Sequence, residues 1–431
     1  MVLMVLVFRR VKVISSNQAI ADNYDVVIIG SGPAGLATAI ELKKLGVRDL
    51  IVLERYAEAG GNPRFCGHSP FGMREFKRIY SGPKYARKLV STAEDAGVTI
   101  ALNTTVISLG EAGALTLSTP KGSKNIKAKR VVLSTGIREL PRAPRFVSGQ
   151  RPEGIVTTGA LQSLVYANHR KPFKKPVIVG SELVSFSAIA TCHHVGIKPV
   201  MMIENNQRVT AYKPLEIYPK ILGIKIALKS RLIEILGTDK VTGVKIADDT
   251  GLEKQIDCDG VIFTGKFLPE ASLVRSAHIE IDPNTQGPEV DQFNRCSDSS
   301  YFATGNILRP VETGGWCWSE GKQTAEFVKA SLSEVLPNRE SSISVNIESD
   351  VVQYVVPQRI CFSEGRVIKG GVKNFQLRFK EEVASKKLSL SVNSTEYFSK
   401  KIRALPERRV LIPISEISHM TIKKSLKIEC K

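Results

Sequence analysis

Two stretches of the sequence follow the same pattern, and this repetition limits the possible fold more than any other feature. The first opens with VVIIGSGPAG and the second with VIVGSELVS. In both, an acidic residue follows the first glycine after 24 residues: Glu54 after Gly30, and Glu204 after Gly180. Each copy continues through strand-like segments to an apolar strand ending in Thr-Gly, RVVLSTG in the first and GVIFTG in the second. A chain that repeats a dinucleotide-binding fold is expected to hold one nucleotide cofactor per copy, or to keep the second copy for its shape.

The composition is that of a globular protein with a strongly basic charge balance. The 431 residues are 42% hydrophobic and 24% charged, with a formal net charge of +19. This length predicts about two to four domains, enough to enclose a large cofactor. The positive field steers anionic substrates, nucleotides or acidic lipid surfaces toward the protein, unless it serves only solubility. Nucleic-acid binding is disfavoured, because the chain has no zinc-finger spacing and no RNP-type motif.

The seven cysteines include no CxxC and no metal-ligand spacing, so we expect no metal site and no redox-active cysteine pair. Their odd, scattered arrangement predicts a reducing, cytoplasmic setting. The opening MVLMVLVF is too short to span a bilayer, and its arginines follow it, which is the wrong order for a signal peptide. We expect a β-strand or a poorly ordered leader there. No other segment approaches 18 apolar residues, so the sequence predicts a soluble or peripheral protein.

The GSGPAG segment lies between an apolar strand and a helical pattern, the context that makes a GxGxxG motif informative. Gly30 permits the tight turn, Gly32 lets the backbone approach a pyrophosphate, and Gly35 allows close helix–strand packing. The helix N-terminus supplies free N–H groups and a partial positive charge. Glu54 ends the next strand, where a carboxylate can accept hydrogen bonds from ribose hydroxyls. The pattern predicts a dinucleotide site.

With these marks the chain resembles the glutathione-reductase-like superfamily of flavoproteins, the pyridine nucleotide-disulfide oxidoreductases, over residues 24–336. The shared motifs are GSGPAG with Glu54, STG, TGKFLPE and YFATGN. The resemblance implies that the first domain holds FAD and that YFATGN touches the ribitol and pyrophosphate. Asn306 stands in this motif where the superfamily usually has an acid, which keeps hydrogen bonding but loses a charge.

The segment STGIRELPRAPRFVSGQRPEGIVTTGALQ points to a narrower group within this superfamily. It is similar to the flavoprotein subunits of opine oxidase, hydroxyproline dehydrogenase and hydrogen cyanide synthase. The similarity implies oxidation of the C–N bond of an amino acid or amine, usually within a multi-subunit complex. The C-terminal iron–sulfur cysteines of those proteins have no counterpart here, since only Cys361 and Cys430 lie beyond residue 336.

The expected fold is α/β, with two Rossmann-like dinucleotide-binding domains and a small C-terminal all-β domain. We expect a leader at 1–23, an FAD-binding domain at 24–140 and 268–336, an NAD(P)-like domain inserted at 141–267, and the β domain at 340–431. The last assignment depends on alternating apolar and polar segments such as SISVNI and KLSLSV. Helices are expected at Ala34–Leu45, Pro83–Ala96 and Gly314–Leu336.

The second copy of the motif has lost two of its three glycines. It reads Gly180-Ser-Glu-Leu-Val-Ser185, so Glu182 places a carboxylate near an incoming pyrophosphate. Repulsion between two charges some 4 Å apart amounts to about 1–4 kcal/mol. Glu204 favours an unphosphorylated ribose if a nucleotide binds at all. The second domain therefore either binds NAD(H) weakly or serves as a scaffold that forms the far wall of the substrate cavity.

The loop GGNPRFCGH occupies the place where disulfide reductases bring their cysteines to the flavin. Only Cys66 is present, so dithiol exchange is excluded, and a small buried side chain is the simpler interpretation. Arg64 can face the pyrophosphate or a substrate carboxylate. His68 has the pKa range to take a proton as hydride leaves for the flavin, or it simply packs in the loop.

The segment after Gly305 leads into a helix whose N-terminus is expected at the pyrimidine edge of the flavin. Arg309, Glu312 and Trp316 are candidates to line the substrate side, although ordinary domain packing explains the tryptophan equally well. The residues expected to bind FAD are Gly30, Gly32, Pro33, Ala34, Gly35, Glu54, Arg55, Gly61, Arg64, Val106, Thr135, Gly136, Gly305 and Asn306, and those expected to act in catalysis are His68, Arg64 and Glu312.

These expectations describe an FAD-dependent oxidoreductase that takes a hydride from a small amino acid, amine or hydroxy acid. A partner protein, quinone or oxygen would reoxidise the flavin. One alternative is an NAD(P)H-dependent reductase of an electron acceptor, with the second domain active. Another is a flavin-bearing assembly subunit of a dehydrogenase complex. The expected partners are the small-molecule substrate and, in a complex, other dehydrogenase subunits or a redox carrier.

Overall fold

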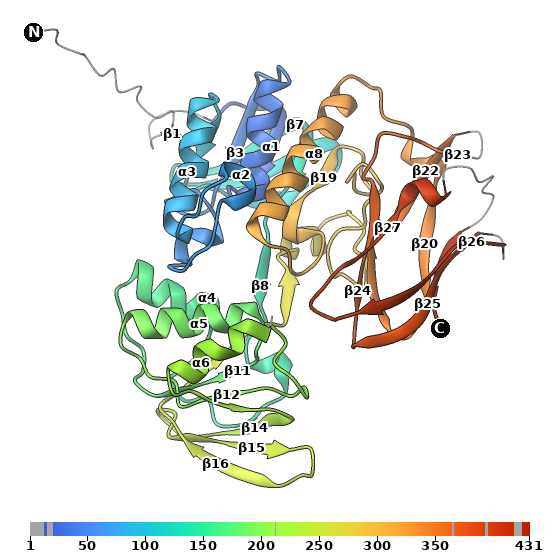
Figure 1. Ribbon diagram of the computed structural model, residues 1–431. Helices are drawn as coiled ribbons and strands as arrows, with labels where there is room; N and C mark the ends of the chain where they lie inside the picture. Colours follow the sequence, from blue (N-terminus) through green and yellow to red (C-terminus); the bar gives the residue numbers. More distant parts are fainter. Residues whose placement is uncertain (1–12, 15–19, 212, 364–365, 393–394, 418–424) are drawn as a thin grey trace, which may run out of the picture.

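The computed structural model describes residues 13–14, 20–211, 213–363, 366–392, 395–417 and 425–431 (Figure 1). Most of the expected leader at 1–23 lies outside these residues. Its described part includes a two-residue strand, β1 (Val13–Ile14). Two α/β units and a region built from strands follow along the chain, which confirms the expected fold class.

The first unit is a sheet covered by helices. Its strands are β2 (Asn23–Ile29), β3 (Leu50–Leu53), β4 (Thr99–Ala101), β5 (Thr105–Leu109), β6 (Ala114–Thr119), β7 (Gly122–Leu133) and β19 (Tyr301–Ala303). Its helices are α1 (Pro33–Lys44), α2 (Met73–Phe76), α3 (Gly82–Asp95) and α8 (Gly314–Leu332).

The parallel part of this sheet has the order β1-β4-β3-β2-β7, and β19 pairs with the end of β7. β5, β6 and the first half of β7 form an antiparallel meander. β3 is buried at every position, as expected for a parallel strand covered on both faces. α1 and α8 pack closely: a Cβ at Gly321 would lie 2.3 Å from the Ala34 carbonyl oxygen. The three expected helices are confirmed as α1, α3 and α8, although α8 ends at Leu332 rather than at residue 336.

The second unit repeats this plan on a smaller scale. Its parallel sheet has the order β10 (Ile155–Thr157), β17 (Gly260–Phe263), β11 (Pro176–Val179), β12 (Met201–Ile203) and β13 (Lys225–Ala227). A second sheet contains β16 (Glu253–Asp257), β15 (Gly243–Asp248), β14 (Ser230–Leu236) and β9 (Ser148–Gly149). The helices are α4 (Thr158–Gln162), α5 (Leu183–His194) and α6 (Ile217–Ile221). Figure 1 shows these helices on the side of the sheet that faces the first unit.

Two short strands connect the units. β8 (Ile137–Glu139) leads out of the first unit and β18 (Phe267–Pro269) leads back into it, and the two pair in antiparallel fashion. Helix α7 (Ser272–Arg275) follows the return. The chain thus crosses between the units twice at one place.

The C-terminal region is built from strands around its own core. A six-stranded sheet contains β20 (Ser342–Glu348), β22 (Arg359–Ser363), β23 (Arg366–Val367), β25 (Val383–Val392), β26 (Thr395–Ala404) and β28 (Leu426–Cys430). A second sheet contains β21 (Val352–Val356), β24 (Asn374–Phe379) and β27 (Val410–Pro413). Phe375, Leu377 and Leu390 lie at the centre of the core.

The C-terminal region contacts both α/β units. Toward the first, the Tyr354 hydroxyl donates to the Pro310 carbonyl oxygen at 2.6 Å. Toward the second, Arg208 forms ion pairs with Glu382 at 3.3 Å and with Glu407 at 3.0 Å. We call these two ion pairs the Arg208 clamp.

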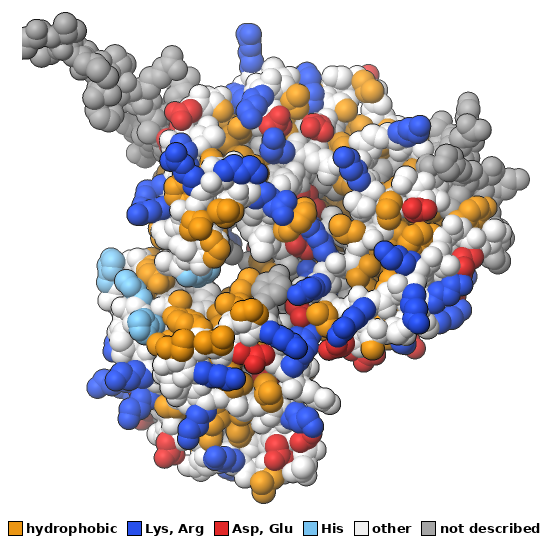
Figure 2. Space-filling view, in the orientation of Figure 1, with side chains coloured by type: hydrophobic (Ala, Val, Ile, Leu, Met, Phe, Trp, Pro, Cys, Tyr) orange, Lys and Arg blue, Asp and Glu red, His pale blue; other side chains and the backbone are white. Residues whose placement is uncertain are grey.

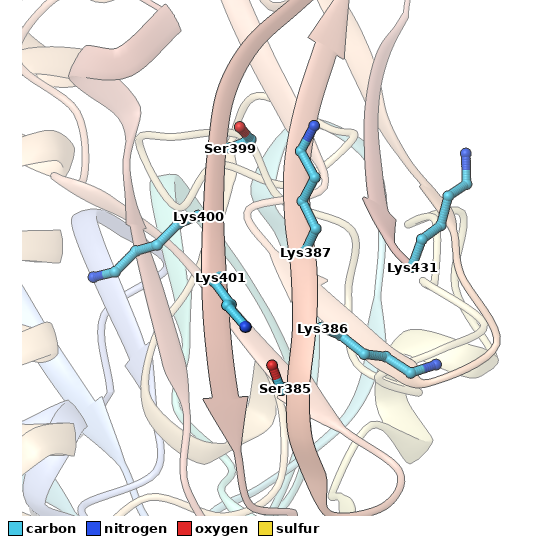
Figure 3. A pocket seen from close by; sticks show the side chains of 7 residues that line it. All are labelled: Ser385, Lys386, Lys387, Ser399, Lys400, Lys401 and Lys431. Atoms are coloured by element: carbon cyan, nitrogen blue, oxygen red, sulfur yellow. The ribbon is translucent and has the colours of Figure 1, made fainter.

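The outer face of the C-terminal region carries a basic hollow. The hollow has a volume of about 400 Å³. Figure 3 shows the five lysines that line it on β25, β26 and the C-terminus: Lys386, Lys387, Lys400, Lys401 and Lys431. Lys387 pairs with Glu396 at 2.8 Å and Lys431 with Glu429 at 3.0 Å, so carboxylates offset part of the positive charge of the hollow. It contributes to the positive field expected from the composition.

Candidate dinucleotide sites and the junction between the domains

The glycine loop of the first unit is tightly packed at two glycines and open at the third. A Cβ at Gly30, which has a φ of +106°, would lie 2.6 Å from the Ser134 carbonyl oxygen. A Cβ at Gly35 would lie 2.1 Å from the Gly30 carbonyl oxygen. A Cβ at Gly32 would meet nothing closer than the Gly61 Cα atom at 4.0 Å. The protein itself therefore requires Gly30 and Gly35, whereas Gly32 leaves a free space at the start of α1.

The acidic residue of the motif is buried beside this loop. Glu54 Oε2 accepts hydrogen bonds from the Ser31 backbone nitrogen at 3.2 Å and from the Ser31 hydroxyl at 2.5 Å. Glu54 Oε1 accepts from the Tyr56 nitrogen at 3.0 Å. A carboxylate has about four acceptor positions, so capacity for a ribose hydroxyl remains. Arg55 lies at the surface, with its guanidinium 4.9 Å from the centre of the Tyr56 ring.

Arg64 reaches this region from the loop that follows. Its Nε donates to the Gly61 carbonyl oxygen at 3.3 Å, and its guanidinium packs on the rings of Tyr56 and Phe65. Its Nη2 is buried and has no hydrogen-bond partner among the described residues. Gly61 approaches the glycine loop so closely that a Cβ there would lie 2.7 Å from the Gly32 Cα atom. Arg64 Nη1 pairs with the exposed Glu58 carboxylate at 3.7 Å. A buried, unpaired guanidinium nitrogen is costly, so Nη2 is available to a further anionic group.

These features fit the diphosphate of FAD. The first turn of α1 has no side-chain cap and carries Pro33 at its start, so the N–H groups of Ala34 and Gly35 are available to phosphate oxygens. Gly136 has a φ of +79° and open space around its Cα atom. The Thr135 hydroxyl instead donates to the Glu270 carbonyl oxygen at 2.7 Å. Val106 is part of the core, so only its backbone is available to a ligand.

The side chains of the segment after Gly305 make their contacts with other parts of the protein. The Asn306 side chain donates to the Glu312 carbonyl oxygen at 2.9 Å and accepts from the Glu312 nitrogen at 2.7 Å. The Glu312 carboxylate pairs with Arg378 at 3.0 Å and with Arg409 at 3.6 Å. The structure therefore places Glu312 at the contact with the C-terminal region, and its role in catalysis stays a prediction.

Arg309 and Trp316, the other two residues expected to line the substrate side, also lie at the contact with the C-terminal region. Arg309 is fully buried and pairs with Glu320 at 3.0 Å. The Trp316 ring lies between the guanidinium groups of Arg74 and Arg409, each 3.7 Å from the ring centre. Packing between domains accounts for these positions.

The second glycine loop has the same hydrogen-bond frame as the first. The Gly180 nitrogen donates to the Ile203 carbonyl oxygen at 2.8 Å, as Gly30 does to Leu53 at 2.9 Å. The Ser181 hydroxyl donates to Glu204, as Ser31 does to Glu54. The repeat recognised in the sequence is therefore a repeat of structure.

The two glycine loops differ in the side chain that fills the second one. The Glu182 carboxylate turns back into it: a Cβ at Gly265 would lie 2.2 Å from Glu182 Oε1, and one at Gly180 would lie 2.6 Å from Oε2. The Thr264 hydroxyl donates to Oε2 at 3.3 Å. Burial raises the pKa of Glu182, and the Arg145 guanidinium partly opposes this. The space that Gly32 leaves free in the first loop is filled here by an acidic side chain.

A group of buried polar side chains at the junction of the two units was missed by the sequence analysis. Cys66 Sγ lies 3.6 Å from Gln162 Oε1, which joins the first unit to α4. Glu139 Oε2 accepts from the Gly159 nitrogen at 2.7 Å. Thr158 is fully buried. The sequence analysis singled out the segments that hold these residues, because Glu139, Thr158 and Gln162 all lie in STGIRELPRAPRFVSGQRPEGIVTTGALQ and Cys66 lies in GGNPRFCGH, but nothing in the segments indicated that the residues meet. Figure 2 shows the surface hollowed where the two units face each other.

Two titratable side chains of the loop, Cys66 and His68, are mainly neutral at pH 7. Burial raises the pKa of the Cys66 thiol to about 12, with the Glu139 charge adding to the effect. Burial also lowers the pKa of His68. His68 packs against Phe71 with ring centres 5.2 Å apart, and its Nδ1 lies 3.4 Å from the Ser69 carbonyl oxygen. The proton-accepting role of His68 stays a prediction.

Two parallel sheets with glycine loops of the same frame define a protein with paired dinucleotide-binding domains. The chain belongs to the pyridine nucleotide-disulphide oxidoreductase family, whose model matches residues 24–332. This confirms the family expected from the motifs. Members of the family are FAD-binding flavoproteins, and FAD is the cofactor that fits the open loop.

Individual relatives are distant. The chain is 26% identical over 320 residues to an opine oxidase subunit of Agrobacterium tumefaciens (strain Ach5), and the match covers 67% of this chain and 62% of that protein. It is 24% identical to a probable ferredoxin reductase, CtmF, of Castellaniella defragrans, with 67% and 69% covered. The chain thus spans about three fifths of the opine oxidase subunit that it matches.

Solved structures share the fold. Thioredoxin reductase of T. acidophilum superposes with a TM-score of 0.61 at 22% identity, over 72% of this chain and 99% of that one. L-proline dehydrogenase of P. horikoshii gives 0.53 at 19% identity, over 72% and 56%. None of the helices within the described ranges is long and apolar enough to cross a membrane.

Proposed function

We propose that this protein is an FAD-dependent oxidoreductase that takes a hydride from a small amino acid, amine or hydroxy acid. A partner protein, quinone or oxygen then reoxidises the flavin. The observation that carries the proposal is the difference between the two loops: the first is open at Gly32, and the second is filled by Glu182. A filled second loop disfavours NAD(P)H as the electron donor, which leaves an organic substrate.

The residues of the first unit have distinct parts in this proposal. When bound, FAD accepts the hydride. The first turn of α1 and Arg64 would hold the diphosphate, and Glu54 would hold the ribose. His68 is neutral near pH 7, because burial lowers its pKa, so it is able to accept a proton from the substrate. Cys66 is a single, neutral thiol and takes no part in disulfide exchange.

The main alternative is an NAD(P)H-dependent reductase. It is favoured by the intact ribose-binding arrangement around Glu204, which accepts from the Asn206 nitrogen at 2.8 Å. A flavin-bearing component of a larger complex is a further alternative, favoured by the relationship to the opine oxidase subunit. We also propose a cytoplasmic setting, in line with the seven free cysteines.

Anaerobic mixing of the FAD-loaded protein with candidate donors distinguishes these functions. Loss of the flavin absorbance with an amino acid, amine or hydroxy acid supports the proposal. Loss with NADH or NADPH at comparable concentration supports the reductase instead. No loss with either, together with co-purification of another subunit, supports the assembly function.

A further inference from the structure

Lysines from three neighbouring backbone segments lie side by side on the outer face of the C-terminal region. Lys387 of β25 is directly opposite Lys401 of β26 in the antiparallel ladder. On its other side, Lys387 exchanges two backbone hydrogen bonds with Lys431, at 2.8 and 3.0 Å. Lys386 and Lys400 flank this row, and all five side chains line the basic hollow (Figure 3). Like charges that face each other across two strands destabilise a sheet, so the fold alone gives no reason for this row.

Carboxylates neutralise only part of this charge. Glu396 pairs with Lys387, and Glu429 pairs with Lys431. The three lysines of the hollow that form no ion pair with a described residue are Lys386, Lys400 and Lys401. The hollow is therefore left with a surplus of three positive charges, which attracts anions.

Protection of the sheet edge accounts for only some of these lysines. β26 is the last strand of its sheet, and edge strands commonly carry lysines that prevent pairing with another chain. This explains Lys400 and Lys401. Lys386, however, lies on β25, which is paired on both sides, and Lys431 follows β28, which lies inside the sheet. Charges away from the edge give no such protection, and they favour a bound partner.

The chemistry of the hollow fits phosphate groups carried on an extended surface. Its other lining residues are Ser385 and Ser399, so it offers ammonium and hydroxyl donors. Pockets for small organic ligands are by contrast lined mostly by apolar side chains. Lysine is a common phosphate ligand. Tyr397 is exposed on β26, and tyrosine is a residue type enriched where proteins meet the membrane–water interface.

The hollow is turned away from the unit that contains the open glycine loop. The other sheet of the C-terminal region contacts that unit: the Tyr354 hydroxyl donates to the Pro310 carbonyl oxygen, and Arg378 Nη2 donates to the Val311 carbonyl oxygen at 3.2 Å. β25 and β26 lie beyond this contact in Figure 1. A partner at the hollow is therefore better placed to anchor the protein than to exchange electrons with a flavin.

We propose that the basic hollow docks the protein on an anionic membrane surface, with Lys386, Lys400 and Lys401 facing the phosphate groups of the lipids. Attraction of this kind needs no apolar insertion, and it acts only within about a Debye length of the surface. The inference goes beyond the proposed function and does not depend on which substrate reduces the flavin.

The test measures co-sedimentation of the FAD-loaded protein with lipid vesicles in about 0.1 M salt. One set of vesicles contains equal parts of phosphatidylglycerol and phosphatidylcholine, and the other contains phosphatidylcholine alone. The hollow variant combines Lys386→Gln, Lys400→Gln and Lys401→Gln. The control variant combines Lys121→Gln, Lys240→Gln and Lys254→Gln, which remove the same charge at exposed positions of the two α/β units.

The wild type and the control variant should bind the anionic vesicles equally. The hollow variant should bind them about 100-fold more weakly, a factor of about five for each lysine. Vesicles of phosphatidylcholine alone should bind none of the proteins, and added salt should weaken the binding of the wild type.

Stability and FAD content separate lost docking from lost folding. The hollow variant should be at least as stable in urea as the wild type, because it removes the repulsion between Lys387 and Lys401, and its FAD content should be unchanged. Lys401→Glu gives a second variant. It places opposite charges across the two strands, so it should stabilise the sheet while weakening vesicle binding about 25-fold, as for a change of two charges.

Three results would overturn the inference. The first is equal vesicle binding by the wild type and the hollow variant. The second is an equal loss in the control variant, because net charge alone would then explain the binding. The third is binding of poly-L-glutamate that needs the three lysines, without binding of anionic vesicles, since the partner would then be an acidic polypeptide. Each of these results leaves the proposed function standing, because reduction of the flavin is measured separately.

Discussion

Exchanging the residues that distinguish the two loops should exchange their binding properties. Glu182 corresponds in position to Gly32, so Glu182→Gly gives the second loop the residue of the first. The Glu182 carboxylate oxygens lie where an added Cβ on Gly180 or Gly265 would be, so the substitution removes both bulk and charge. The charge alone opposes a phosphate about 4 Å away by about 1–4 kcal/mol. NADH should therefore bind Glu182→Gly about 5- to 1000-fold more tightly than it binds wild type.

Calorimetric titration of the FAD-loaded protein with NADH measures this change. Glu182→Gln removes the charge and keeps the bulk, so its affinity should lie between those of wild type and Glu182→Gly. The reciprocal variant, Gly32→Glu, should lose FAD, whereas Gly32→Ala should fold normally because its Cβ has 4.0 Å of clearance. Tight NADH binding by the wild type, or retention of FAD by Gly32→Glu, would show that the reasoning is wrong.

The same carboxylate predicts a pH dependence. Burial raises the pKa of Glu182 in the folded protein, so a fall in pH protonates it before an ordinary glutamate. Protonation removes the negative charge from the second loop, where the Ser185 and Thr264 hydroxyls donate to the carboxylate and the charges of Glu204 and Arg145 act on it. NADH affinity of the wild type should therefore rise as pH falls. Glu182→Gly should lack this dependence, and an identical pH profile in both proteins would refute it.

Three further substitutions test the remaining assignments. Arg64→Met should weaken FAD binding about 10- to 100-fold, measured by flavin fluorescence after dilution, and Arg64→Lys should recover part of the affinity. If Arg64→Met retains FAD as well as wild type does, Arg64 is assigned to the substrate instead. Cys66→Ser should reduce the rate of flavin reduction by less than about twofold, because a thiol with a pKa of about 12 is not a nucleophile at pH 7. A large loss of flavin-reduction rate would contradict this prediction. Glu312→Gln should lower the free energy of unfolding by about 3–5 kcal/mol in urea, because it leaves Arg378 and Arg409 without their partner. If Glu312→Gln instead abolishes flavin reduction at unchanged stability, the catalytic role is favoured.

The dinucleotide fold was predictable because its signals are local. Gly30, Gly35 and Glu54 lie within 25 residues of one another, and their spacing follows from one strand, one helix and the next strand. The helix bounds were also close, since Pro33 and the glycine after Leu45 mark the ends of α1. A requirement for glycine can be inferred from the sequence at such positions, because the steric constraint comes from the backbone.

The polar contacts at the junction of the two units were not predictable, because the residues that make them come together only through tertiary packing. Glu139 and Gly159 are 20 residues apart and meet because β8 lies next to α4. Cys66 and Gln162 are separated by 96 residues. Glu312 was assigned to the substrate side from its place after the flavin motif, but its arginine partners come from a region without chemical motifs. Long-range pairs of this kind leave no pattern in the order of the residues.

The Arg208 clamp has a mechanical consequence. The only covalent links between the α/β units within the described chain are the two segments through β8 and β18, an arrangement that by itself would allow one unit to swing against the other. The C-terminal region holds the first unit through Tyr354 and the second through Arg208, and so acts as a brace across this hinge. A large rotation would have to break both ion pairs of the clamp. Because both pairs are partly exposed and each is worth about 0–1 kcal/mol, they favour the orientation of the two units without locking it.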